Sequence, residues 1–206
     1  MNYLAHLLLS GPDADLALGN FLADMLTPDQ SATLAPEILD GVMLHRAIDT
    51  FTDAHPSVRN STARIRGTQR KYAPVSIDIY FDYLLVRNWS AFSSIALDDM
   101  AAFTYAQLRQ RLQAVPTALQ PRVQSMIDHQ WLTTYQTSEG IGQVFRRMSK
   151  RASKPEIFLG ALRELEEVDR ELQADFLVFF PDLIDHVLDI HPRGNVWINP
   201  RNGRRS

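Results

Sequence analysis

Histidine, asparagine and aspartate side chains recur four residues apart in the first half of the chain. His45 and Asp49 have this spacing in "LHRAID", and Asn20 and Asp24 have it in "GNFLADM". Residues four apart lie on one face of an α-helix, so both side chains of a pair can reach one point beside it. Such a pair can hold one metal ion, or a carboxylate can orient an imidazole. For His45 and Asp49 the alternative is a hydrogen-bonded pair on a solvated face.

A third pair, Asp78 and Asp82, lies in the apolar segment "VSIDIYFDYLLVRNW". A carboxylate among apolar neighbours loses several kcal/mol of solvation, so it must take up a proton or find a cation. That cation is either a metal ion or an arginine from another helix, and the residues alone leave both open. His6, in "NYLAHLLL", adds an imidazole from a further apolar segment, although a single histidine on such a face is more often a core residue.

Because several helical segments each bring a histidine or an aspartate inward, we predict that these side chains converge on one metal site. As ligands we rank Asp24, His45 and Asp78 first, and then His6 and Asp49. The chain has no cysteine, which excludes disulfides and cysteine-type zinc sites. Imidazole and carboxylate ligands favour Mn²⁺, Mg²⁺ or Fe²⁺ over a structural zinc.

A divalent ion in such a site would lower the pKa of a bound water and polarise a phosphoryl oxygen, as hydrolysis of a phosphate ester requires. Arg46, next to His45, is predicted to stabilise the charge that builds on the phosphate. Asn20 and Asp82 are the other candidate catalytic residues. The sequence shows no Ser-His-Asp order and no nucleophile elbow, so a covalent serine intermediate is not favoured.

Helical periodicity dominates the sequence, and sustained alternation of the kind found in strands is missing. Proline suits the first turn of a helix and opposes its interior, and Pro36, Pro56 and Pro155 each precede a periodic run. We predict helices over residues 2–9, 13–26, 36–54, 57–70, 75–92, 98–113, 117–131, 134–151 and 156–190, with a break in the last near Pro181. This pattern indicates an all-α, single-domain bundle of about eight to ten helices.

The helical domain is expected to span residues 1–190, and residues 191–206 to form an irregular or mobile tail with Trp197 docked on the body. The formal net charge of −3 gives no sign of nucleic-acid binding, which normally needs a strongly basic face. No window is apolar enough for a membrane span, and the N-terminus lacks the basic region of a secretory signal. We therefore expect a cytoplasmic protein.

Four blocks in order resemble the acyl carrier protein phosphodiesterase family, also called acyl carrier protein hydrolase: "MNYLAHLLLS", "GNFLADML", "DGVMLHRAIDTFTD" and "APVSIDIYFDYLLVRNW". They cover roughly residues 1–92, and the later half of the chain follows more loosely. The resemblance implies an all-helical, HD-domain-like relative of the HD phosphohydrolases. It also implies removal of 4′-phosphopantetheine from holo acyl carrier protein, usually with Mn²⁺, within fatty acid biosynthesis.

The resemblance carries over onto a set of polar positions in this chain: His6, Asn20, Asp24, His45, Arg46, Asp49, Asp53 and Asp78, with Asp82 close by. The chain departs from the ordinary HD pattern, because "HRAID" stands where a histidine would be followed directly by aspartate. The imidazole–carboxylate pair is then supplied either by His45 with Asp49 or by His6 with Asp24, and the sequence does not decide between them.

An acidic carrier protein as partner implies a docking surface with local positive charge. The favoured candidate is the basic run of Arg59, Arg64, Arg66, Arg70 and Lys71. A second candidate is the run of Arg146, Arg147, Lys150, Arg151 and Lys154. For each run the alternative is a solvated helix face that binds no partner.

Two other functions remain open at this stage. One is an HD-type phosphohydrolase acting on a nucleotide or small phosphoester, and the other is a non-catalytic helical binding protein whose histidines and aspartates are only ion-paired. The aromatic residues at helical spacing are interpreted as core rather than as a substrate box: Trp89, Trp131, Phe176, Phe179 and Phe180.

Overall fold

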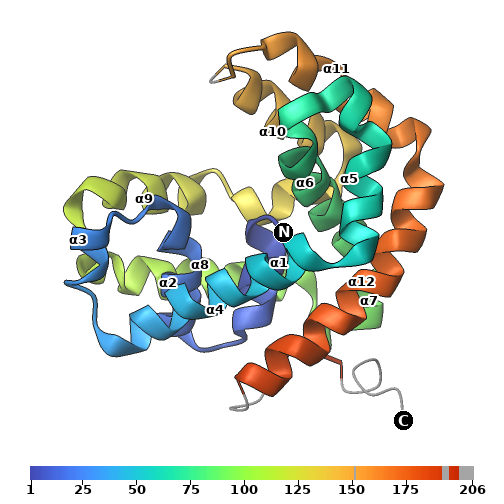
Figure 1. The fold of residues 1–206 in the computed structure, drawn as a ribbon. Coiled ribbons are helices and arrows are strands. Elements are labelled where there is room, and N and C mark those ends of the chain that lie inside the picture. The colour runs from blue at the N-terminus through green and yellow to red at the C-terminus, as the bar shows by residue number, and fades with distance from the viewer. Residues whose placement is uncertain (151, 192–194, 200–206) are drawn as a thin grey trace.

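Helices make up nearly all of the chain in the computed structural model, which describes residues 1–150, 152–191 and 195–199 (Figure 1). The longer helices are α1 (Tyr3–Ser10), α2 (Ala14–Leu22), α4 (Pro36–Ala54), α5 (Pro56–Gln69), α6 (Ala73–Arg87), α8 (Leu97–Gln110), α9 (Gln120–Asp128), α10 (Ser138–Ser149), α11 (Pro155–Glu167) and α12 (Asp169–Ile190). Shorter turns are α3 (Pro28–Ser31), α7 (Trp89–Phe92) and the 3₁₀ helices η1 (Ala23–Met25), η2 (Arg70–Tyr72), η3 (Leu112–Ala114), η4 (Thr117–Leu119) and η5 (Trp131–Gln136). The predicted all-α fold is confirmed, since the described residues contain only one isolated β-bridge.

The predicted break in the C-terminal helix was misplaced. The segment 156–190 is two helices, α11 and α12, which are separated at Val168, and Pro181 lies inside α12. Proline removes one helical hydrogen bond, from its own position to the carbonyl four residues earlier. That carbonyl belongs to Leu177, which is exposed, so water can take the place of the missing donor.

A second boundary differs between residues 131 and 149. A single helix was predicted over 134–151, but the 3₁₀ helix η5 comes first and α10 begins only at Ser138. Thr137 supplies the start signal, because its hydroxyl accepts a hydrogen bond from the backbone N–H of Gly140 at 3.0 Å. The threonine cap therefore marks the true beginning of the helix.

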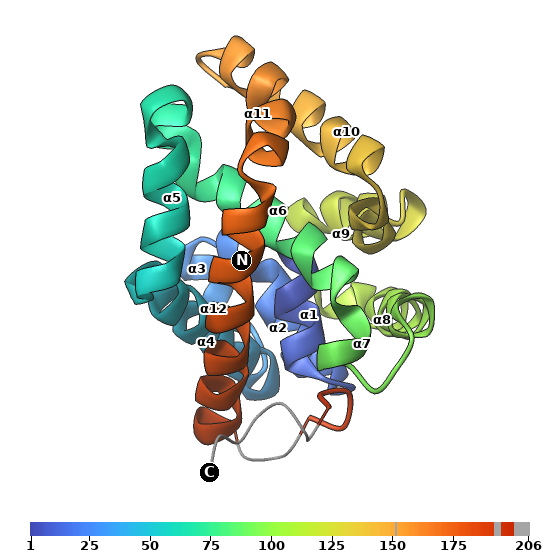
Figure 2. The same ribbon diagram turned by 90° about the vertical axis from the view of Figure 1, so that its right-hand side faces the viewer.

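The helices form two connected groups around a central α6. At one end α10 packs against α11, while α1, α2 and α4 pack together at the other, and α12 runs past α4 and α5 (Figures 1 and 2). Aromatic rings join α6 to α12 in the core: Phe81 lies 5.4 Å from Phe176 and 5.7 Å from Phe179 between ring centroids. Phe176, Phe179 and Phe180 are fully buried, which confirms their assignment to the core.

Helices α2 and α4 touch backbone to backbone at two glycines. A Cβ atom on Gly19 would lie 1.8 Å from the carbonyl oxygen of Ile38, and one on Gly41 would lie 2.2 Å from that of Leu16. No real side chain fits at such distances, so glycine is required at both positions. The close crossing brings the end of α2, with Asn20, against the middle of α4, where His45 lies.

The C-terminal segment returns to the body of the protein. Trp197 is 7% exposed, and its ring packs edge-on against Phe103 at 5.5 Å between centroids. Its backbone carbonyl accepts a hydrogen bond from the N–H of Ser94 at 2.8 Å. Residues 192–194 and 200–206 of the predicted tail lie outside the described residues. Among the described helices, none combines the length and the apolar character that crossing a membrane requires.

Candidate metal centre

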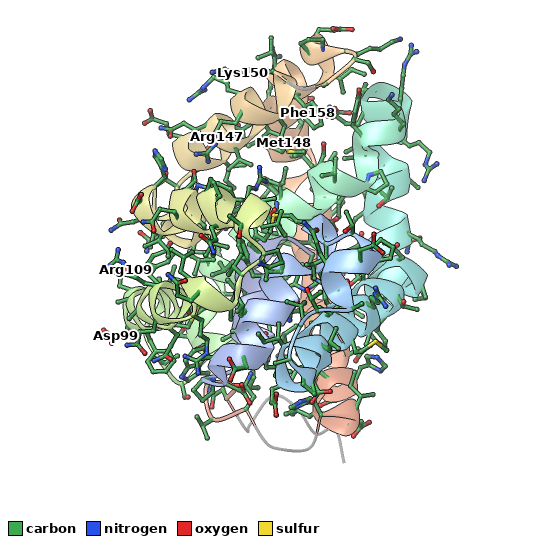
Figure 3. The ribbon with its side chains drawn as sticks, turned by 90° about the vertical axis from the view of Figure 1, so that its left-hand side faces the viewer. Asp99, Arg109, Arg147, Met148, Lys150 and Phe158 are labelled. Carbon is green, nitrogen blue, oxygen red and sulfur yellow. The ribbon has the colours of Figure 1, made fainter. Side chains whose placement is uncertain are left out.

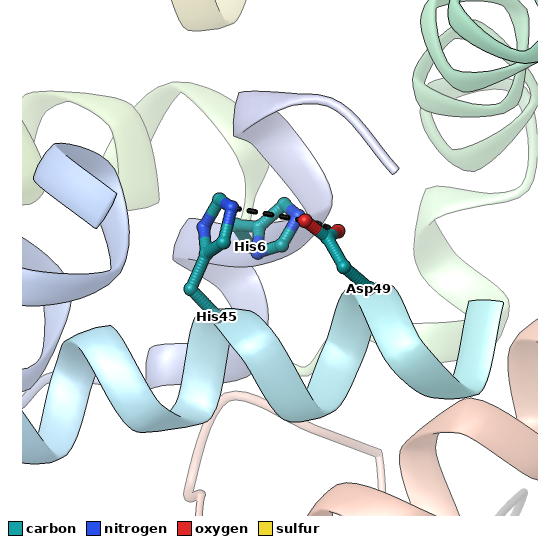
Figure 4. A group of neighbouring side chains, drawn as sticks. All are labelled: His6, His45 and Asp49. Carbon is teal, nitrogen blue, oxygen red and sulfur yellow. Dashed lines mark ion pairs between the residues drawn. The ribbon is translucent and has the colours of Figure 1, made fainter. Parts of the chain in front are cut away.

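Two histidines and one aspartate meet where α1 packs against α4 (Figure 4). Helix α1 supplies His6, and α4 supplies His45 and Asp49. The Nε2 atom of His6 lies 3.2 Å from one carboxylate oxygen of Asp49, and Nε2 of His45 lies 3.0 Å from the other. The two imidazole rings stack at 4.2 Å between centroids. One candidate ligand atom from each residue lies within 4.8 Å of the other two, a separation that one metal ion can bridge.

Asn20 sets the orientation of both rings from behind. Its side-chain oxygen lies 2.8 Å from Nδ1 of His6, while its amide nitrogen donates to the backbone carbonyl of His6 at 3.0 Å. The same amide nitrogen donates to the hydroxyl of Ser10. Nδ1 of His45 lies 2.8 Å from the backbone carbonyl of Asn20 and 3.1 Å from its side-chain oxygen. Because these oxygens only accept, both histidines carry a proton on Nδ1.

With the proton on Nδ1, each neutral imidazole turns the lone pair of Nε2 toward the carboxylate of Asp49. Two lone pairs that face a carboxylate repel it unless a cation lies between them; in the metal-free protein this cation is a proton on Nε2 of His45, and a divalent ion can take its place. Nε2 of His6 is buried and has no hydrogen-bond partner, because its 3.2 Å approach to Asp49 lacks hydrogen-bond geometry. Histidine ligands of metal ions usually donate their other ring N–H to a carbonyl in this way. The residues present therefore fit a divalent ion.

The charges of these groups depend on one another. Burial opposes the charged form of both imidazoles and lowers the pKa of His6. At His45 the carboxylates of Asp24 and Asp49 outweigh burial and raise its pKa to about 9. Burial alone would raise the pKa of Asp49, but the two imidazoles hold it well below its usual range. His45 is thus protonated at neutral pH in the metal-free protein, and a metal ion would have to displace that proton.

Asp24 approaches the cluster from the solvent side. It lies in η1, directly after α2, and its carboxylate is 3.1 Å from Nε2 of His45. Its side chain is 65% exposed, and the hydrogen bond from His45 lowers its pKa. Asp24 can therefore act as a further ligand, and its carboxylate is more exposed to solvent than that of Asp49.

The two predicted aspartates of α6 lie apart from the histidines. Asp78 lines the same cavity, but its carboxylate accepts a hydrogen bond from the amino group of Met1 at 3.0 Å. Asp82 is fully buried and accepts from the backbone N–H groups of Leu4 at 2.8 Å and Ala5 at 3.3 Å. Burial raises the pKa of Asp82 to about 7. Asp82 thus anchors the start of α1, which carries His6.

Arg46 does not face the cluster. It is exposed on α4, where its guanidinium lies 3.9 Å from the sulfur of Met43, and it does not line the cavity. Asp53, one turn beyond Asp49, is also exposed and outside the cavity; burial and the nearby carboxylates of Asp78 and Asp49 raise its pKa.

The cluster opens into a cavity of about 560 Å³ between the two groups of helices. His6, Asp24, His45 and Asp78 are among its lining residues. The rest of the lining is largely apolar with a few cations, and comprises Val75, Arg122, Trp131, Tyr135, Val144, Arg147, Met148, Lys150, Ala152 and Phe158, among others. Figure 3 shows Arg147, Met148, Lys150 and Phe158 together on α10, its C-terminal end and α11.

Residues 1–183 match the sequence model of the acyl carrier protein phosphodiesterase family. The chain belongs to this family. Proteins named acyl carrier protein phosphodiesterase from Yersinia enterocolitica and Serratia proteamaculans are each 29% identical over 190 residues, covering 92% of this chain and 98% of theirs. One from Escherichia coli O45:K1 is 27% identical over 186 residues, covering 90% and 96%. No solved structure matches the chain significantly, so the HD-like arrangement stays a prediction.

Sequence reasoning did not identify the cavity wall of this family member. Trp131 was assigned to the core, but it is half-buried and faces the cavity, and Arg122 was not considered at all. Both belong to the second half of the chain, where their own segments show no unusual pairing of ionisable residues. The apolar residues Val144, Met148 and Phe158 have ordinary helical spacing. Only the packing of α10 and α11 above α6 shows that they face a cavity.

Proposed function

We propose that this protein hydrolyses the phosphodiester bond between 4′-phosphopantetheine and the serine of holo acyl carrier protein, with a divalent metal ion, Mn²⁺ in the first place. Family membership supports the substrate. The convergence of His6, His45 and Asp49 at one point of a cavity supports the metal, and it is the observation on which the proposal rests. The products are apo carrier protein and 4′-phosphopantetheine.

The protein residues divide the work of holding the ion. Nε2 of His6, Nε2 of His45 and the carboxylate of Asp49 are the proposed ligands, with Asp24 completing the set from the solvent side. Bound there, a divalent ion would supply an activated water and polarise a phosphoryl oxygen. Asn20 keeps both Nδ1 atoms protonated, and thus both Nε2 lone pairs available. The carboxylate of Asp78 is neutralised by the amino group of Met1.

The cavity also suits the phosphopantetheine arm. Its volume of about 560 Å³ is within the range of small-molecule sites. The apolar side chains of Val144, Met148 and Phe158 line the same cavity as His6 and His45, so the arm can lie along them while its phosphate reaches the histidines. An arm bound in this orientation leaves the carrier protein outside, at the mouth of the cavity.

The basic residues nearest the cavity indicate where an acidic carrier docks. Arg147 and Lys150 of the second basic run are exposed and line the cavity. In the run on α5 and η2, Lys71 reaches Ser153, next to the cavity wall, whereas Arg64 pairs with Asp175. We therefore place the carrier on the α10 side; the run on α5 and η2 stays a prediction, and Arg151 lies outside the described residues. The KM for carrier protein should rise steeply with salt.

A mass spectrum of holo carrier protein after incubation with this protein tests the proposal directly. We expect a mass loss equal to that of the prosthetic arm when Mn²⁺ is present, and no loss in EDTA. Asp49→Asn should abolish the loss. The matched control is Asp99→Asn, because Asp99 is exposed on α8 and lies away from the labelled cavity residues (Figure 3).

If the arm stays intact after incubation with Mn²⁺ and the same preparation hydrolyses nucleotides, the substrate is a small phosphoester and not holo carrier protein. Full activity of Asp49→Asn would remove the proposed metal centre. Unchanged activity after exhaustive chelation would have the same effect, because the histidines and aspartates would then act without an ion.

A further inference from the structure

The cavity contains an arginine close to the first turn of α1, the helix that carries His6. Arg122 lies on α9, and its Nη2 atom lies 3.4 Å from the hydroxyl of Tyr3. Its guanidinium carbon is 4.9 Å from the ring centroid of Trp131. The rings of Tyr3 and Trp131 are 5.8 Å apart, and all three residues line the cavity. The guanidinium is thus held by an aromatic face and a phenol, and these contacts fix its plane.

The charge of Arg122 has no counterion among the described residues. The side chain forms no ion pair with a described carboxylate, and its Nε atom is buried with no hydrogen-bond partner. An arginine has five N–H donors and can never act as an acceptor. The buried Nε–H is therefore withdrawn from water without gaining a hydrogen bond, which costs free energy. An anion in the cavity would accept that bond.

The other cations of the cavity do not meet this description. Arg147 and Lys150 are exposed at its edge, where water solvates their charges. The amino group of Met1 is bound to Asp78. Arg46, which sequence reasoning placed on the phosphate, lies outside the cavity and next to Met43. Arg122 is therefore the cation whose burial and unused donors both point to a ligand.

We propose that Arg122 binds the phosphate of the substrate, in the role that sequence reasoning had given to Arg46. The identity of this substrate rests on the proposed function, whereas the binding of an anion rests on the contacts of Arg122. A guanidinium presents parallel N–H donors that match two oxygens of one phosphate, and stacking on Trp131 keeps this fork in one plane. The phosphate would then lie between the guanidinium and the histidine cluster, which line the same cavity.

The test compares Arg122→Met, which keeps much of the side-chain volume, with Arg122→Lys, which keeps the charge but loses the fork. We expect kcat/KM on holo carrier protein to fall about 10²- to 10³-fold in Arg122→Met, as for the removal of a donor that stabilises transition-state charge. Binding of inorganic phosphate, measured by calorimetry with and without Mn²⁺, should weaken at least about 10-fold. Arg122→Lys should recover only part of either loss.

Two further measurements distinguish phosphate binding from a structural role. The affinity for Mn²⁺ should stay unchanged in Arg122→Met, because the described contacts of Arg122 are with Tyr3 and Trp131 and include no residue of the histidine cluster. Arg109→Met is the matched control, since Arg109 is exposed on α8 (Figure 3), and it should behave like the wild type. If Arg122→Met does not fold, judged by circular dichroism, the comparison of Arg122→Lys with the wild type decides.

The inference is overturned if Arg122→Met binds phosphate and turns over carrier protein as the wild type does, above all if Arg46→Met loses both. A wild-type protein that leaves holo carrier protein intact would refute the proposed function instead. Phosphate binding would still be measurable in that case, and its loss in Arg122→Met would uphold the assignment of Arg122.

Discussion

Asn20 should control the affinity for metal although it touches no metal ligand atom. Its side chain makes four contacts, to Nδ1 of His6, Nδ1 of His45, the backbone carbonyl of His6 and the hydroxyl of Ser10. In Asn20→Ala, Nδ1 of His45 keeps the backbone carbonyl of residue 20, and the carbonyl of His6 keeps the hydroxyl of Ser10. Nδ1 of His6 loses its acceptor entirely.

These losses set the expected magnitude. One buried donor without a partner costs about 1–3 kcal/mol, and each of the other lost bonds about 1 kcal/mol. The free energy of unfolding of the metal-free protein should therefore fall by about 4–6 kcal/mol. The His6 ring is then free to turn and to carry its proton on either nitrogen. Loss of such an orienting partner typically weakens metal binding 10- to 100-fold, or about 1.4–2.8 kcal/mol.

Urea unfolding in EDTA measures the first quantity, and calorimetric titration with Mn²⁺ measures the second. Ser10→Ala is the control, because it removes bonds at the far end of the same network and leaves the acceptor of His6 in place. It should cost about 2 kcal/mol, for the two bonds removed, and leave the Mn²⁺ affinity unchanged. A folded Asn20→Ala protein with wild-type affinity for Mn²⁺ would refute the reasoning.

Three further outcomes follow from the structure. The raised pKa of His45, about 9, predicts that the metal-free protein loses about 3 kcal/mol of stability as pH rises from about 6.5 through 9, measured by urea unfolding; His45→Gln should lack this loss. Gly41→Ala places a Cβ 2.2 Å from the carbonyl oxygen of Leu16, so the free energy of unfolding should fall by about 2–3 kcal/mol, seen as a lower melting temperature. The control Gly67→Ala has open space around its Cβ and should raise the free energy of unfolding by up to about 1 kcal/mol. The raised pKa of Asp82, about 7, predicts that stability falls by on the order of 4 kcal/mol as pH rises from about 4 through 7, and that Asp82→Asn unfolds without this pH dependence; a parallel slope in the variant would contradict the assignment.

The helical fold could be predicted because its signals are local. Proline at the first turn located the starts of α4, α5 and α11 to within a residue. The break between α11 and α12 was missed because Val168 carries no such signal. Pro181 misled because an exposed helix face supplies water to the carbonyl that proline leaves without a donor.

The candidate site was predictable in part. Four-residue spacing on α4 placed His45 beside Asp49, and His6, which was also predicted as a ligand, joins them from α1. Spacing alone does not show which way a helix turns its polar residues relative to its neighbours. Arg46 follows His45 in sequence but points to solvent, and Asp82 faces the backbone of α1. Such placements are set by how α1, α2, α4 and α6 cross, which no single segment encodes.

The backbone contact between α2 and α4 tolerates no substitution at its two glycines, whereas other parts of the cavity tolerate substitution. Gly19 and Gly41 leave no space for any other residue, and the crossing they allow holds Asn20 of α2 against α4, which carries His45 and Asp49. Other parts of the cavity lining are apolar side chains such as Val144 and Met148, whose volumes can be exchanged at modest cost. Efforts to redirect the protein to a different substrate should therefore alter α10 and α11 and leave the crossing of the two earlier helices untouched.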